Sequence, residues 1–231
     1  MSTRRILVAI TALALLSGST AYANSLQVSA AAAMTGSFGL AVTLDPLSPN
    51  NSVYVEKTGW DESSILARWQ WRRGDLVADT IDSVSFALMA LLGHSTGGPT
   101  PGVLQIMGRA YLSGKGHIVG QPPRAFFRLH VMCRNSNNSA RFSNTLTIPK
   151  TLAGTGTNAT IQMEYELIPS TGTNFDGICC VRAIGVGERC RTDAQTYLNH
   201  ITGVRFGAFG TGNLTSDADG TYNLDTFEAF R

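Results

Sequence analysis

The chain is poor in charge and has no strongly basic segment. Only 15% of its 231 residues are charged, and no run of lysine or arginine exceeds two residues. Folded domains carry about 25% charged residues and disordered chains more, so we expect a folded domain with a hydrophobic core. A nucleic-acid binder would show a basic face, so that class of function is disfavoured.

A membrane-spanning run of apolar residues is also missing. The apolar run Ile6–Leu16 has 11 residues, well short of the roughly 20 that a spanning helix needs. It follows Arg4 and Arg5 and precedes Ala21-Tyr22-Ala23, which is the pattern of a secretory signal peptide. We therefore predict a signal peptide over residues 1–23, cleaved after Ala23, and one secreted or periplasmic domain over residues 24–231 without a stable membrane span. Loss of the leader reduces the 18 basic residues to 16, equal to the acidic ones, so the mature domain is neutral.

Helical periodicity is scarce, and alternation with period two replaces it. In the segment 65–72 the odd positions are apolar, whereas Arg68, Gln70 and Arg72 share the other face. The segments 127–134 and 161–167 show the same alternation. The segment 83–92 has helix-forming residues, but its first half alternates, and we interpret it as mainly strand. Several short strands separated by turn residues predict an all-β sandwich or jelly roll.

Three segments carry a resemblance to a known family. The C-terminal residues 204–208 and 220–231 resemble the closing strands of bacterial secreted laminin G-like, concanavalin A-like lectin-glucanase domains. The opening Ala31–Val42 and the strand Ala67–Trp71 are similar to the family's small-residue opening and its Arg-aromatic strand. The resemblance implies a two-sheet antiparallel jelly roll, one sheet of which binds glycans in many relatives. Because the family includes binding modules and enzymes, the fold alone does not decide between them.

The four cysteines all lie in the mature chain, which predicts two disulfides in an exported protein. A three-residue turn centred on Gly185 would place Cys180 opposite Cys190. Adjacent strand residues point to opposite faces, so Cys179 faces elsewhere and could meet Cys133. Four reduced, buried thiols are the alternative. Zinc is disfavoured, because Cys179 and Cys180 are adjacent and no paired histidine spacing accompanies them.

Two enzyme hypotheses arise from polar strand faces. Glu164 and Glu166 share a face at roughly 6–7 Å along the strand, near the separation of the two carboxylates in glycosidases. Jelly-roll glucanases carry a similar strand motif, but its first polar residue is an acid, whereas this chain has Gln162 at that position. Jelly-roll polysaccharide lyases use Arg, Gln, His and Tyr around an acidic sugar, and His130 lies on a polar strand face, although the family's Gln-Ile-His motif is absent. The remaining histidines of the mature chain are interpreted as solvated loop residues. They are His94, His117 and His200.

Calcium is the only cofactor that the sequence suggests. Asp217 and Asp219 lie in a polar loop before Gly220 and offer hard oxygen ligands. The twelve-residue calcium loop is incomplete because no acid stands at its last position. A turn stabilised by aspartate side chains explains the same residues, so we expect no obligatory cofactor.

For ligand binding, the sequence favours one aromatic residue and a set of arginines. Trp60 lies in a polar segment and is the best exposed platform for a sugar ring, although it could equally cover the core. The predicted polar contacts are Arg68, Arg72 and Arg128. If the strands that carry them were neighbours in one sheet with those of His130, Glu164 and Glu166, one charged groove would form.

We therefore predict a monomeric, non-catalytic module that binds a glycan or cell-surface polysaccharide. The alternatives are a polysaccharide-degrading enzyme on the same fold, either a glycoside hydrolase or a lyase, and a structural envelope protein.

Overall fold

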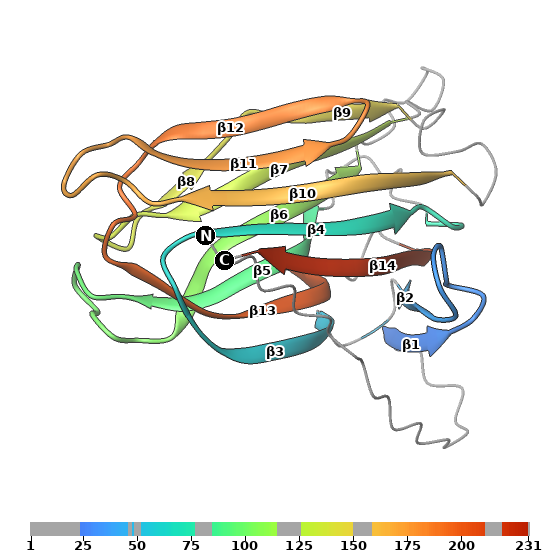
Figure 1. The fold of residues 1–231 in the computed structure, drawn as a ribbon. Coiled ribbons are helices and arrows are strands. Elements are labelled where there is room, and N and C mark those ends of the chain that lie inside the picture. Colours follow the sequence, from blue (N-terminus) through green and yellow to red (C-terminus); the bar gives the residue numbers. More distant parts are fainter. Residues whose placement is uncertain are drawn as a thin grey trace.

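The protein folds as a sandwich of two antiparallel seven-stranded sheets that lie face to face (Figure 1). The computed structural model describes residues 24–45, 48, 52–76, 85–114, 126–149, 159–210 and 219–230, and in these residues it contains strands and no helix. The all-β, two-sheet jelly roll expected from the sequence is confirmed.

The first sheet has the strand order β1-β2-β14-β4-β10-β11-β12. Its strands are β1 (Ser25–Ser29), β2 (Gly39–Leu44), β4 (Ile65–Arg72), β10 (Thr160–Ile168), β11 (Gly177–Ala183), β12 (Gly187–Ala194) and β14 (Gly220–Phe230). The second sheet has the order β3-β13-β5-β6-β7-β8, and β9 also pairs with β7. Its strands are β3 (Ser52–Glu62), β5 (Ser85–Ser95), β6 (Gln105–Gly114), β7 (Phe126–Arg134), β8 (Ala140–Phe142), β9 (Leu146–Pro149) and β13 (Asn199–Gly210).

Alternating side chains of facing strands fill the space between the sheets. In β4 every second residue is buried, and Trp69 and Trp71 are fully enclosed. The Trp69 ring lies 5.7 Å from that of Phe206 on β13, edge to face, and Trp71 lies 5.5 Å from Phe127 on β7. These contacts join the two sheets through their largest apolar side chains, whose burial stabilises the fold by about 25 cal/mol per Å².

Strand β5 covers the described part of the segment 83–92, so the strand interpretation is confirmed there. Its alternation is interrupted by an irregularity in the pairing with β6 between Ala87 and Met89. As a result Leu88 and Met89 both belong to the main core, whereas Ala87 and Ala90 belong to a second, smaller cluster on the outer face of the sheet. Irregularities of this kind re-aim side chains without ending the strand.

The cysteines form the two disulfides that the hairpin geometry and the alternation favour. Cys180 and Cys190 are directly opposite in the β11–β12 pairing, and the hairpin turns through Gly185, which has a φ of 81°. Cys179 points to the other face and bonds Cys133 of β7, which lies in the second sheet. One disulfide therefore ties two neighbouring strands, and the other ties the two sheets.

The described residues give limited information on export. Among them, no helix has the length and apolar character to span a membrane. The predicted signal peptide and its cleavage site after Ala23 lie outside the described residues and stay predictions. Two disulfides are consistent with an extracellular protein, because they persist in oxidising compartments.

The two disulfides should contribute unequally to stability. Cys133 and Cys179 are 46 residues apart and Cys180 and Cys190 are 10 apart, and the longer loop restricts the unfolded chain more. We expect the double variant Cys133→Ala/Cys179→Ala to lose about 4 kcal/mol of unfolding free energy, and Cys180→Ala/Cys190→Ala about 3 kcal/mol. Urea unfolding of the oxidised mature chain measures both, and a larger loss from the hairpin pair would contradict this order.

Candidate functional site

The polar residues singled out in the sequence lie on two opposite surfaces of the sandwich. Arg68 on β4 and Glu164 on β10 are on the outer face of the first sheet. Arg128 and His130 on β7 are on the outer face of the second sheet. The hydrophobic core separates the two sets, so the predicted single charged groove is wrong.

On the first sheet, the two glutamates are ion-paired. Arg68 Nε donates to Glu164 Oε1 at 2.7 Å, because the two residues are direct partners in the β4–β10 pairing. Arg182 of β11 lies 3.7 Å from Glu164 Oε2, and its Nη2 donates to Glu166 Oε2 at 2.6 Å. Burial alone would lower the pKa of Arg182, but its hydrogen bonds to Glu166 and Glu188 outweigh that effect and raise it. The carboxylate oxygens that a glycosidase would turn toward its sugar are thus occupied by guanidinium groups.

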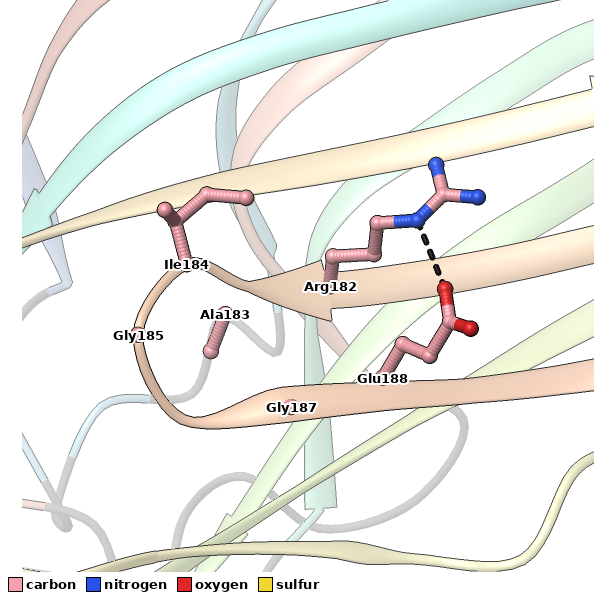
Figure 2. A pocket seen from close by; sticks show the side chains of 6 residues that line it. All are labelled: Arg182, Ala183, Ile184, Gly185, Gly187 and Glu188. Carbon is pink, nitrogen blue, oxygen red and sulfur yellow. Dashed lines mark hydrogen bonds and ion pairs between the residues drawn. The ribbon is translucent and has the colours of Figure 1, made fainter.

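The β11–β12 hairpin beside this network forms an open recess. Figure 2 shows Arg182 and Glu188 on its wall, with Arg182 Nε donating to Glu188 Oε2 at 2.7 Å. The rest of the recess is formed by Ala183 at the end of β11, Ile184 and Gly185 in the turn, and Gly187 at the start of β12. Because the arginine is already paired with acids, the recess offers no uncompensated charge to a ligand.

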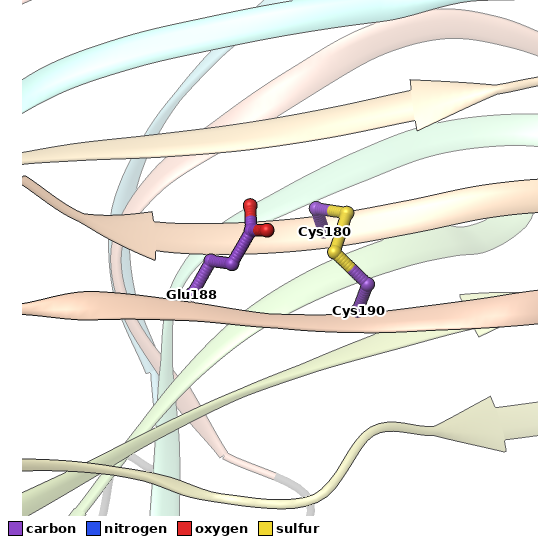
Figure 3. Close-up of side chains that lie close together, drawn as sticks. All are labelled: Cys180, Glu188 and Cys190. Carbon is purple, nitrogen blue, oxygen red and sulfur yellow. A yellow bond between two sulfur atoms is a disulfide. The ribbon is translucent and has the colours of Figure 1, made fainter.

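Glu188 also lies near the Cys180–Cys190 disulfide (Figure 3). The three side chains are close enough to resemble a metal site, and no other such cluster occurs in the part of the chain that the structure describes. Metal ligation by cysteine requires a thiolate, whereas both sulfurs here are bonded to each other. This cluster therefore provides only one carboxylate.

Two residues that were predicted to contact a ligand, Trp60 and Arg72, contact other parts of the protein instead. Trp60 is 6% exposed and belongs to the main core, so the prediction of an exposed sugar platform is wrong and the alternative, a residue that covers the core, is what the structure contains. The reason is that β3 extends to Glu62 and its pairing with β13 is irregular between Gly203 and Ile201, so the core side of β3 changes from odd residues such as Val55 to Trp60. Arg72 Nη2 donates to the carbonyl oxygen of Ala31 at 2.7 Å and fixes the connection between β1 and β2.

The histidine and calcium predictions have mixed outcomes. His94 and His200 are strand residues, not loop residues, and their rings stack at 5.2 Å because they are paired across β5 and β13. His200 Nδ1 lies 2.8 Å from Asp61 Oδ1. His117 and Asp217 lie outside the described residues and Asp219 is exposed, so the expectation that calcium is not obligatory stays a prediction.

The second sheet brings together three residues with complementary chemistry. Tyr111 on β6 is paired with His130 on β7, and their rings stack nearly parallel at 4.9 Å. Arg109, two residues before Tyr111 on the same strand face, donates from Nη1 to the tyrosine Oη at 2.7 Å. We call Arg109, Tyr111 and His130 the β6–β7 triad.

The orientation of Arg109 depends on a close contact behind the sheet. The pairing of β5 with β6 is irregular around Met107, and Gly108 packs against Tyr165 of the opposite sheet. A Cβ at residue 108 would lie 2.1 Å from Tyr165 Oη, so only glycine fits. Tyr165 Oη in turn donates to the carbonyl oxygen of Met132 at 3.2 Å. The core thus supports β6 and β7 directly beneath the triad.

The cations around the triad have no acidic partner in the part of the chain that the structure describes. Among the described residues, no ion pair forms with Arg109, Arg128 or Arg134, and Arg134 donates instead to the carbonyl oxygens of Ile106 and Asn138. Burial and the neighbouring Arg109 lower the pKa of Arg134. Burial also lowers the pKa of His130 below its ordinary 6.5, and His130 Nδ1 has no protein hydrogen-bond partner in the described chain. Clustered cations of this kind favour an anionic ligand.

Sequence reasoning found His130 but missed its partners. Tyr111 and Arg109 alternate with Ala110 and Leu112, which both belong to the core, so period two alone could have placed them on an outer face. They lie beside His130 because β6 pairs with β7, and the sequence carries no local signal for that pairing.

Comparisons with known proteins give fold neighbours only. No family description and no curated protein matches the chain by sequence. The solved structure of an endo-β-1,4-glucuronan lyase from the fungus Trichoderma reesei is similar with a TM-score of 0.54 and 13% identity, over 90% of this chain and 87% of that one. The alginate lyase Aly36B, as a mutant in complex with an alginate tetrasaccharide, has a TM-score of 0.53 and 16% identity, over 83% and 80%. At these identities the likeness establishes the fold.

These neighbours also correct the functional prediction. Both are polysaccharide-degrading enzymes by name, which contradicts the predicted non-catalytic module and favours the enzyme that the sequence left as its alternative.

The ion-pair network on the first sheet should be structural. In Glu164→Gln, Arg68 and Arg182 lose a largely buried charged partner, so we expect a loss of about 1–2 kcal/mol of unfolding free energy, between the values for exposed and buried pairs. Denaturant unfolding at low salt is the measurement, with Asp219→Asn, an exposed acid just before β14, as the control. A Glu164→Gln chain as stable as wild type would show that the network contributes nothing.

Proposed function

We propose that this protein is a lyase that cleaves an acidic polysaccharide on the outer face of the second sheet. The observation that carries the proposal is the β6–β7 triad: a histidine whose pKa is lowered by burial, a tyrosine hydroxyl stacked beside it, and an arginine that forms no ion pair among the described residues. The fold likeness to a glucuronan lyase and an alginate lyase supports the same class of reaction.

The first requirement of such a reaction is neutralisation of the sugar carboxylate. In a uronic acid, the C5 proton is adjacent to a carboxylate, and its removal places more negative charge on that group. Arg109 and Arg134 supply positive charge at this point, and both stand without an acidic protein partner among the described residues. Fixed cations of this kind stabilise charge that develops in a transition state.

The second requirement is a base and an acid. Neutral His130 takes the C5 proton, the electron pair of that bond forms the C4=C5 double bond, and the C4–O4 bond breaks. The Tyr111 hydroxyl gives its proton to the departing O4, and the hydrogen bond that its oxygen accepts from Arg109 stabilises the phenolate that remains. No water is consumed, which distinguishes this elimination from hydrolysis.

The triad assigns separable roles that mutation can test. We expect His130→Ala and Tyr111→Phe each to lower kcat by roughly 10²–10⁴-fold on glucuronan or alginate, the usual contribution of a positioned acid or base. The ultraviolet absorbance of the new C4=C5 double bond measures turnover. Glu166→Gln, on the opposite surface, is the control and should retain full activity. Cleavage without a rise in absorbance, abolished by Glu166→Gln, would establish a hydrolase instead.

The pH dependence of the reaction follows from the His130 pKa. Burial disfavours the charged imidazolium, so the pKa lies below 6.5. As a base, His130 must be neutral, and activity should therefore fall as the pH drops through the lowered pKa and reach a plateau on this limb above it. A profile of kcat/KM against pH reports this group in the free enzyme. An acid limb centred above pH 6.5 would exclude His130 as the base.

A further inference from the structure

Phe142 is a large apolar side chain left half exposed beside the triad. It is the last residue of β8 and pairs with Met132 of β7, so it lies on the same outer face as Tyr111 and His130. Its side chain is 50% exposed, and its ring centroid lies 6.4 Å from that of Tyr111 and 6.4 Å from that of His130. Leaving this much apolar surface in water is unfavourable by about 25 cal/mol per Å².

The arrangement of the three rings leaves a surface of Phe142 available for contact with a ligand. Tyr111 and His130 stack on each other at an interplanar angle of 7°, so each uses one of its faces in that contact. The Phe142 ring is tilted by 42° to Tyr111 and by 48° to His130. It therefore touches them without stacking on either, and its exposed surface continues the site toward the edge of the sheet.

Within the described residues, the other exposed aromatic side chain on this face is already covered. Tyr54 on β3 is 37% exposed, but the guanidinium of Arg205 lies 4.5 Å from its ring centroid and the Phe209 ring packs against it edge-on. Arg205 also pairs with Glu56 at 2.8 Å. The β3 side of the face is thus charge-compensated and its aromatic surface is occupied, whereas the β8 side is open.

We propose that Phe142 is the stacking platform for the pyranose ring next to the one that is cleaved, an inference that rests on the proposed function. The apolar C–H face of a sugar ring fits an exposed aromatic surface, while its polar groups remain free for the arginines. The Phe142 ring centroid lies 6.4 Å from those of Tyr111 and His130, so a sugar stacked on Phe142 is next to the sugar that lies over the triad. The polysaccharide then crosses β8, β7 and β6 roughly perpendicular to the strands.

The test separates binding from turnover. Affinity electrophoresis in gels that contain alginate or glucuronan measures binding in a Tyr111→Phe background, which keeps the ring and removes the hydroxyl. We expect Phe142→Ala to weaken binding of the polymer about tenfold and Phe142→Trp to restore it. Phe38→Ala is the matched control, because Phe38 is 65% exposed and precedes β2 at the far end of the first sheet. In the active enzyme, Phe142→Ala should raise KM with kcat nearly unchanged.

The outcomes distinguish this inference from the proposed function. A wild-type protein that cleaves neither polymer, with binding still lost in Phe142→Ala and regained in Phe142→Trp, would overturn the lyase and leave the platform in place. An active lyase in which Phe142→Ala leaves both KM and binding unchanged would overturn the platform alone. Equal losses in Phe142→Ala and Phe38→Ala, or no binding of either polymer by any variant, would also overturn it.

Discussion

The packing of two sheets through alternating side chains is the constraint on which the rest of this structure depends. Each strand residue must face either the shared core or water, and the large rings of Trp69 and Trp71 occupy the core side of β4 against Phe206 and Phe127. Once these rings are fixed in the core, the polar residues that alternate with them along the strand must face the solvent. The core therefore determines which charges can meet.

The two outer faces that result are electrostatically different. On the first sheet, Arg68 and Arg182 are paired with glutamates, so the charges of this network compensate one another. On the second sheet, Arg109 and Arg134 lie close together, and within the described residues their hydrogen bonds go to a tyrosine, an asparagine side chain and backbone carbonyls. Such a cationic cluster attracts anions, and an acidic polymer is the anion that the proposed function requires.

Local features of the fold were predictable from the sequence, and long-range ones were not. The alternation in β4, β7 and β10 and the hairpin that brings Cys180 to Cys190 depend on neighbours along the chain. Sheet membership depends on which distant strands pair, so the sequence could not show that His130 lies on the opposite surface from Glu164. Trp60 was misplaced for a related reason, since Gly59 suggested a loop where β3 continues. Tyr111 becomes a candidate site residue only through its pairing with His130, which is a long-range contact.

The two consecutive cysteines of β11 have a mechanical consequence. Because Cys179 and Cys180 point to opposite faces, one strand is bonded both to the edge strand β12 and, across the core, to β7. One side of the sandwich is thereby closed by a continuous covalent link through three strands, close to the proposed site on β7. The other side, where β1, β2 and β3 lie, is held without a covalent link, by packing, hydrogen bonds and ion pairs such as that of Arg205 with Glu56. We expect opening of the sandwich, and hence attack by proteases, to begin on that unlinked side, while the strands that carry the proposed chemistry remain tethered.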